Sequence, residues 1–163
     1  MAIPKKLINF LEKGKVKYEI LKHRTVYTAF DKAKTLKIPE KMVEKTLVLK
    51  TDGKLAMVLI PANKNLDLQK FKKLAKAKKI DFASERLIKN KFKGVKVGAI
   101  PPFRLQPAHH PTRKILTFID KSLLKNPKII VNGGDYNFSI KLKSKEIKKL
   151  VPDSIFGNFG KKK

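Results

Sequence analysis

The segment TLVLKTDGKLAMVLIP, Thr46 to Pro61, decides the fold of this 163-residue chain. Two strand-like runs flank Asp52-Gly53, a dipeptide that favours the tight two-residue turn of a β-hairpin. We therefore expect an antiparallel pair of strands here.

Helices and strands are expected on both sides of this hairpin. The spacing of Ile3, Leu7 and Phe10 predicts a short amphipathic helix. Thr28 with Asp31 three residues later resembles a capping box, which opens a helix that ends near residue 39. Further strands are predicted over residues 16–20, 114–120, 128–134 and 136–142, and further helices over 67–79 and from 84 onward. The sum is a single α+β domain, residues 1–163, with about six or seven strands and a frayed tail at 161–163.

The charge of the chain points to a class of partner. Lys and Arg supply 40 residues and Asp and Glu only 13, which gives a formal net charge of +27. A field of that size attracts polyanions, so nucleic acid is the expected partner. Only four basic residues are arginines suited to reading base edges, so lysine contacts with phosphates are favoured. The alternative is a lysine enrichment that reflects growth temperature or genome bias.

Several classes of site are disfavoured. The chain has no cysteine, which excludes a disulfide framework, a thiolate nucleophile and a Cys-type zinc site. Neither the nucleophile motif G-x-S-x-G nor the phosphate loop G-x-x-x-x-G-K occurs. His109 and His110 are adjacent and point in different directions in a regular element, so no metal site is expected. We expect a cytoplasmic protein, because no apolar run suits a membrane span or a leader peptide.

The helix expected over residues 67–79 has one apolar face, formed by Leu68, Phe71 and Leu74. Lysines occupy the other faces and are the predicted contacts with nucleic-acid phosphates. These lysines are Lys70, Lys72, Lys73, Lys76 and Lys79.

Three further features are candidates for a site, each with a plainer alternative. Lys45 lies at the start of an apolar strand, from where it could reach a ligand phosphate. The alternative is that it is one more surface lysine. The segment VGAIPPF, Val97 to Phe103, has no charge and is stiffened by two prolines. It forms a binding loop or ends a strand on an apolar patch. His23 belongs to a site, or it is a solvent-facing or structurally bonded histidine.

Four segments, in this order, resemble the YbaK/prolyl-tRNA synthetase-associated domain family of trans-editing aminoacyl-tRNA deacylases. HRTVYT, His23 to Thr28, is similar to the family's H-x-x-V-Y-T opening. EKTLVLK places Lys45 at the family's functional lysine, and VGAIPPF resembles its G-x-x-x-P glycine loop, Gly98 to Pro102. VNGGDYNFSIKL resembles its closing strand, turn and strand.

The resemblance implies a mixed, mostly antiparallel sheet wrapped by helices, with a cavity that receives the 3′ end of a mischarged tRNA and hydrolyses its aminoacyl ester. Lys45 and Gly98 are the implied catalytic residues, because the lysine holds the terminal phosphates and the glycine loop holds the aminoacyl group. The implied substrate-binding residues are His23, Tyr27, Thr28, Thr46, Gly98, Ala99, Ile100, Pro101, Pro102, Gly134 and Asp135. A cavity that receives a small neutral side chain beside a cationic α-amino group is expected to exclude further positive charge.

The resemblance implies no cofactor and no metal, and its partners are tRNA and an aminoacyl-tRNA synthetase. Ala-, Ser- and Cys-tRNA(Pro) are the candidate substrates, while the sequence specifies neither the amino acid nor the oligomeric state. Arg104 follows the loop where the family often has glycine, and Asn137 and Phe138 stand where some subfamilies have a polar residue or histidine. The alternative function is a tRNA- or ribosome-binding module of the same fold without turnover.

Overall fold

The predicted hairpin forms the centre of the largest sheet. In the computed structural model, which describes residues 3–105 and 115–163, β2 (Glu44–Thr51) pairs antiparallel with β3 (Lys54–Pro61). Asp52 and Gly53 have φ angles of 49° and 84°. Positive φ at both turn positions matches the twist of the flanking strands, so the Asp-Gly turn closes the hairpin as predicted.

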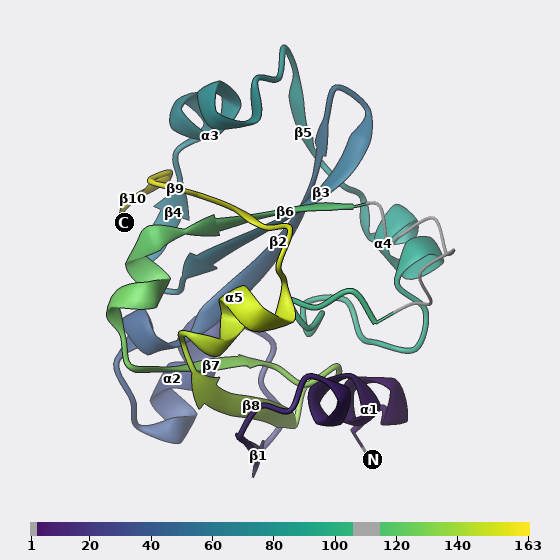
Figure 1. Ribbon diagram of the computed structural model, residues 1–163, viewed down its shortest axis with the longest axis vertical. Coiled ribbons are helices and arrows are strands. Elements are labelled where there is room, and N and C mark those ends of the chain that lie inside the picture. The colour runs from purple at the N-terminus through teal and green to yellow at the C-terminus, as the bar shows by residue number, and fades with distance from the viewer. Residues whose placement is uncertain (1–2, 106–114) are drawn as a thin grey trace.

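Among the described residues, ten strands form three sheets. The five-stranded sheet has the order β5-β2-β3-β6-β9, and its β3–β6 and β6–β9 pairs are parallel. An antiparallel sheet of order β1-β8-β7 lies below it in Figure 1, and β10 pairs antiparallel with β4. The other strands are β1 (Tyr18–Lys22), β4 (Lys64–Leu66), β5 (Ile80–Phe82), β6 (Leu116–Asp120), β7 (Lys128–Asn132), β8 (Phe138–Lys143), β9 (Ile155–Gly157) and β10 (Gly160–Lys162).

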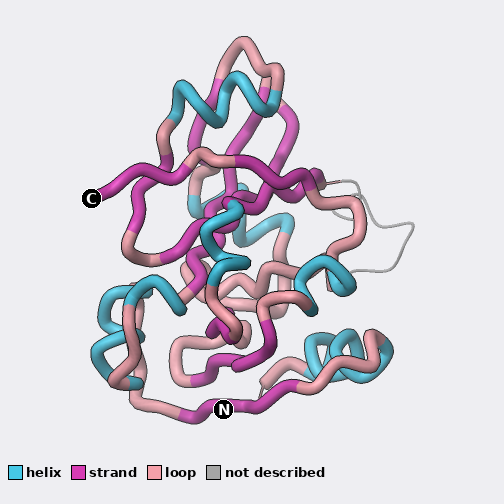
Figure 2. The backbone as a smooth tube through the Cα atoms, turned by 60° about the vertical axis from the view of Figure 1, so that its left-hand side comes forward, coloured by secondary structure: helices cyan, strands magenta, loops and turns pink. Residues whose placement is uncertain are grey.

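Two helices begin where a hydroxyl group accepts a hydrogen bond from the first turn. The Thr28 hydroxyl accepts from the Asp31 N–H at 3.0 Å, and the Ser84 hydroxyl accepts from the Leu87 N–H at 3.1 Å. The helices are α1 (Lys5–Lys13), α2 (Ala29–Leu36), α3 (Leu68–Ala75), α4 (Glu85–Lys91) and α5 (Glu146–Leu150), with short 3-10 helices η1 (Glu40–Met42) and η3 (Lys121–Lys125). Both views place α3 at the hairpin end of the molecule and α1 at the opposite end (Figure 1, Figure 2).

The two largest apolar clusters lie on opposite faces of β3. Leu59 faces a cluster shared by α1, β7, β8 and α5, whereas Val58 and Ile60 face a cluster beneath α3. In the second cluster the ring of Phe71 packs edge-to-face against Phe118, with centroids 5.0 Å apart. Alternate side chains of one strand thus hold both halves of the fold together.

The predicted α+β class with mostly antiparallel strands is confirmed, but the strands are divided differently from the prediction. The expected single sheet of six or seven strands is three sheets, because β1 and β7 pair with β8 and not with the hairpin. The predicted fraying of residues 161–163 is wrong for Lys161 and Lys162, which pair with Asn65 and Lys64.

The helix predicted over 67–79 is shorter than expected. It ends at Ala75, and Lys76 has a left-handed φ of 53°. The Asp52 carboxylate accepts hydrogen bonds from the N–H groups of Lys78 at 3.0 Å and Lys79 at 2.8 Å. These bonds hold the chain after Lys76 in a conformation that does not continue the helix.

Two further expectations concern the adjacent histidines and the lack of a membrane-spanning segment. His109 and His110 lie outside the described residues. Within residues 3–105 and 115–163, no helix combines the length and the apolar character that crossing a bilayer requires.

Candidate functional site

A cavity of about 240 Å³ lies where four separate segments of the chain meet. Its walls come from residues 26–29, 44–47, 98–99 and 135–136, with Lys32 and Asn132 between them. These segments belong to the start of α2, the start of β2, the glycine loop and the turn after β7. The cavity therefore gathers parts of all four sequence segments that we singled out.

The glycine loop lines this cavity with Gly98 and Ala99. Gly98 has a φ of +85°, a conformation that only glycine adopts readily. Three loop carbonyls accept hydrogen bonds from neighbouring segments: Val97 from the Tyr136 hydroxyl (2.6 Å), Ala99 from the Gly134 N–H (3.0 Å) and Ile100 from the Asn132 side-chain amide (3.1 Å). In the described part of the chain, no hydrogen bond has the Gly98 N–H as its donor. Its donor capacity is available to a ligand.

Lys45 lines the cavity, but its ammonium group is already bound to main chain. Nζ donates a hydrogen bond of 2.8 Å to the Lys64 carbonyl oxygen of β4. Burial lowers the pKa of Lys45, and the charge of Lys163 lowers it further, while Glu40 opposes both. An ammonium group has three N–H donors, so Lys45 can hold this carbonyl and an anionic ligand at the same time.

Two ionisable side chains are buried in the wall of the same cavity. Lys32 is 6% exposed and donates to the Asn132 side-chain oxygen at 2.7 Å. Glu44 is 1% exposed, and one of its oxygens accepts from the Thr46 hydroxyl at 2.7 Å, while its Oε1 has no hydrogen-bond partner within residues 3–105 and 115–163. Burial lowers the pKa of Lys32 to about 8 and raises the pKa of Glu44 to about 8, and each charge partly offsets the other's shift.

The buried Lys32 corrects one expectation from the sequence. We expected the cavity to exclude further positive charge, yet a lysine ammonium lies in its wall. Two acidic side chains, Glu44 and Asp135, line the same cavity. The cavity therefore contains both basic and acidic side chains.

Two tyrosine rings of the cavity lining pack against each other. Tyr27 is 68% exposed, and its ring meets that of Tyr136 edge-to-face with centroids 4.8 Å apart. The Tyr136 hydroxyl is fixed by its bond to Val97, which holds the second ring in place. A large exposed aromatic ring beside a cavity is a surface on which a flat ligand can stack.

Other substrate-binding residues implied by the resemblance form hydrogen bonds within the fold. Thr28 lines it, but its hydroxyl caps α2, and Asp135 accepts from the following N–H, that of Tyr136, at 2.7 Å. Gly134 supports the loop from behind through Ala99. His23 is not among the lining residues. Its Nδ1 donates to the Arg24 carbonyl and its Nε2 accepts from the Ser139 hydroxyl, each at 2.8 Å, which is the geometry of a structurally bonded histidine.

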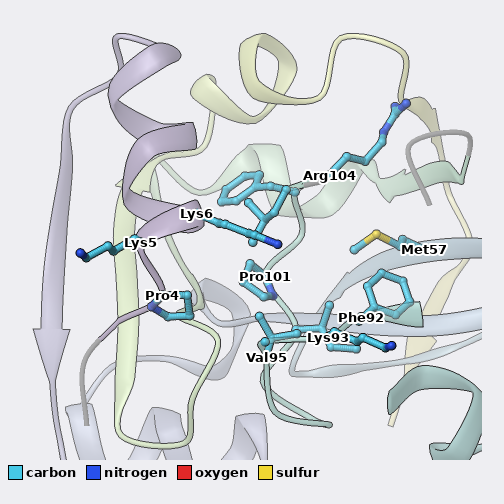
Figure 3. Close-up of a pocket in the computed structure, with 13 residues that line it drawn as sticks. Pro4, Lys5, Lys6, Met57, Phe92, Lys93, Val95, Pro101 and Arg104 are labelled. Atoms are coloured by element: carbon cyan, nitrogen blue, oxygen red, sulfur yellow. The ribbon is translucent and has the colours of Figure 1, made fainter. Parts of the chain in front are cut away.

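Ile100 and Pro101 face a different cavity, also of about 240 Å³, on the other side of the glycine loop. Met57, Phe92 and Phe103 give this second cavity an apolar lining. Figure 3 shows Lys6 reaching from α1 towards Pro101, whereas Lys5 points away. Pro102 is buried and lines neither of the two cavities. The loop therefore contributes to both cavities. Of its predicted site residues, only Gly98 and Ala99 line the cavity that contains Lys45, whereas Ile100 and Pro101 line the apolar one.

None of the lysines predicted to contact nucleic acid lines the cavity. Lys70, Lys72, Lys73, Lys76 and Lys79 are all exposed. Lys79 also forms an ion pair of 3.9 Å with Asp81. Asp52, which holds the chain at Lys79, is at the far end of β2 from Lys45, a separation of about 23 Å for an extended strand. These lysines can contact a long ligand but not a group inside the cavity.

Sequence reasoning missed Lys32, Glu44 and Asn132. One signal was available for Lys32, because Ala29, Ala33 and Leu36 form the apolar stripe of α2 and Lys32 falls within that stripe. Nothing comparable marks Glu44, which is one charged residue at the start of a strand. No cluster of three or more potential metal-binding side chains occurs in the described ranges of the chain.

Comparison with known proteins agrees with this geometry. The family model of the aminoacyl-tRNA editing domain matches residues 23–150. The hypothetical protein APE2540 has a similar structure, with a TM-score of 0.82 at 22% identity over 96% of this chain and 99% of that one. A protein described as a candidate trans-editing enzyme for prolyl-tRNA synthetase has a TM-score of 0.79 at 21% identity over 96% of both chains.

Proposed function

The chain belongs to the aminoacyl-tRNA editing domain family, and we propose that it is a deacylase that acts in trans and hydrolyses the ester bond between a wrong amino acid and its tRNA. The observation that carries this proposal is the meeting of Lys45, the unpaired Gly98 amide and the Tyr27 ring at one small cavity. The cavity combines a cation, a hydrogen-bond donor and a stacking surface, which suit a phosphate, an ester carbonyl and a base.

An aminoacyl ester is already activated, so its hydrolysis needs orientation more than a strong nucleophile. When water attacks the carbonyl carbon, negative charge develops on the carbonyl oxygen, and a fixed N–H donor stabilises that charge. The Gly98 amide is the donor that we assign to this role. We assign no nucleophilic role to the two threonine hydroxyls of the cavity. The Thr28 hydroxyl caps a helix, and the Thr46 hydroxyl donates to Glu44.

The tRNA is proposed to approach along the sheet. Tyr27 stacks on the terminal base, an interaction that tolerates any base because each has a π-face. Lys45 binds a terminal phosphate while keeping its bond to the Lys64 carbonyl. The exposed lysines of α3 and the segment after it then contact phosphates of the acceptor stem.

The cavity size favours a small aminoacyl group. About 240 Å³ is below the range of roughly 300 to 1,000 Å³ typical of small-molecule pockets. We therefore propose Ala-, Ser- and Cys-tRNA(Pro) as the substrates to examine first.

The test is release of radiolabelled amino acid from a panel of aminoacyl-tRNAs under single-turnover conditions. The panel contains the three proposed substrates and correctly charged Pro-tRNA(Pro) as the matched control. Release from at least one mischarged tRNA, with Pro-tRNA(Pro) left intact, supports the proposal. Binding of tRNA without release from any member contradicts it and favours a non-catalytic binding module.

A further inference from the structure

The deacylation chemistry proposed above leaves Lys32 without a role. A lysine that is almost fully buried loses the solvation of its charge, so it destabilises the fold unless its contacts compensate. A leucine or methionine on the apolar stripe of α2 would avoid that penalty. The contacts of Lys32 therefore indicate what the ammonium group is for.

A chain of two hydrogen bonds connects Lys32 to the glycine loop. Its Nζ donates to Asn132 Oδ1 at 2.7 Å, and the Nδ2 of the same side chain donates to the Ile100 carbonyl oxygen at 3.1 Å. Asn132 is buried at the end of β7, where its amide has little freedom to turn. Ile100 lies two residues after Gly98, so this chain links α2 to the backbone that orients the Gly98 amide.

Glu44 lies in the same cavity wall as Lys32. Burial raises the pKa of Glu44 to about 8, and Lys32 and Glu44 each influence the pKa of the other. Glu44 also fixes the Thr46 hydroxyl. Removing Lys32 alone therefore changes the environment of a second buried ionisable group, so a single substitution perturbs both groups.

We propose that Lys32 is a positioning residue of this site: through Asn132 it fixes the Ile100 carbonyl and thereby holds the Gly98 amide against the ester. The inference rests on the proposed deacylase function. Lys32 does not touch the reacting atoms in this account, and it acts through the loop.

The decisive comparison is Lys32→Gln against Lys32→Met. The two replacements are similar in size and uncharged, but only glutamine can donate a hydrogen bond to Asn132. We expect Lys32→Met to lower the single-turnover rate of deacylation by about tenfold to a hundredfold, the effect of misplacing a reacting geometry. Lys32→Gln is expected to retain most of the rate, and tRNA affinity should be unchanged in both.

A second variant and a control keep structural effects apart. The double variant Lys32→Met/Glu44→Gln removes both buried ionisable groups and should regain stability to urea without regaining the rate. Lys125→Met removes the same charge from an exposed position in η3, outside the proposed binding surface, and should leave the single-turnover rate unchanged. Equal rates for Lys32→Gln and Lys32→Met, or a wild-type rate in the double variant, would overturn the positioning role.

A measurement without substrate separates this inference from the proposed function. The Gly134 N–H donates to the Ala99 carbonyl, so its hydrogen exchange reports whether the loop is held. We expect exchange to be at least about tenfold faster in Lys32→Met and close to the wild-type rate in Lys32→Gln. If the wild-type protein hydrolyses no aminoacyl-tRNA but exchange follows this order, the function fails and the loop anchor stands. Unchanged exchange in Lys32→Met removes the anchor whatever the activity.

Discussion

Replacing Glu44 with glutamine should change how the stability of the protein depends on pH. The carboxyl group has a pKa of about 8 in the fold because it is buried, against an ordinary value of 4.5. Between these values the folded protein keeps a proton that the unfolded chain has lost. Stability contributed by this group is therefore greatest at acidic pH and decreases as the pH rises towards 8. Glu44→Gln cannot titrate, so it lacks this decrease.

The size of the effect follows from the one proton involved. A difference of one bound proton changes the free energy of unfolding by at most about 1.4 kcal/mol per pH unit. From about pH 5.5 to about pH 7.5 the wild type should therefore lose up to about 2.7 kcal/mol relative to Glu44→Gln. A loss of about 2.7 kcal/mol is a large share of the net free energy of unfolding of a typical domain, which is roughly 5 to 15 kcal/mol.

The assay is urea unfolding of both proteins at a series of pH values, followed by circular dichroism. The difference between the two free energies is the quantity of interest, since titrations that do not depend on Glu44 cancel in it. His23, whose pKa is lowered mainly by burial, makes stability rise with pH through its titration, but it does so in both proteins. A difference that stays flat over this range would refute the reasoning, because it would mean that Glu44 is ionised in the folded protein.

Four further outcomes are expected. Gly98→Ala should destabilise the fold by about 1 to 2 kcal/mol in urea unfolding because of its φ of +85°, and should reduce deacylation far more than tRNA affinity; equal effects on both would contradict the assigned role. Lys45→Ala should lower the single-turnover rate much more than Lys76→Ala, which removes the same charge at an exposed position; matching losses would make Lys45 an ordinary surface lysine. The logarithm of the tRNA affinity should fall linearly with the logarithm of salt concentration, and an affinity indifferent to salt would exclude phosphate contacts as its source. Asp120→Ala should destabilise the protein by about 1 to 3 kcal/mol in thermal or urea unfolding, because it removes the oxygen that accepts from the N–H groups of Phe159 and Gly160 at 2.9 Å each; an unchanged stability would show that these bonds contribute nothing.

Features that depend on neighbouring residues could be predicted from the sequence. The Asp52-Gly53 turn and the Thr28 cap form because the required groups lie within three residues of one another. The strands β4, β9 and β10 have three residues each and form through partners far along the chain, so no local pattern marks them. The end of α3 was missed for the same reason, since the Asp52 carboxylate that competes with the helix comes from the hairpin turn.

The candidate site follows the same rule. Tyr27, Lys45 and Gly98 belong to segments that could be singled out in the sequence, and the fold brings those segments to one cavity. The chemistry of Lys32 and Glu44 arises from burial, which composition cannot assign to one lysine among many. Ile100 and Pro101 were placed with Gly98 because they are adjacent in sequence, but the loop turns them towards the apolar cavity.

The pairing of β1 with β8 has a consequence for how the protein acquires its shape. Strand β1 contributes to a sheet whose other members are made only near the far end of the described chain. A nascent chain on the ribosome therefore cannot complete this sheet, or the cavity that needs residues 132–136, while the early segments emerge. Such high contact order predicts refolding in milliseconds to seconds and not in microseconds. During that interval the unpaired edge of the β2–β3 hairpin is open to association with other chains, and the large excess of positive charge is the feature that keeps those chains apart.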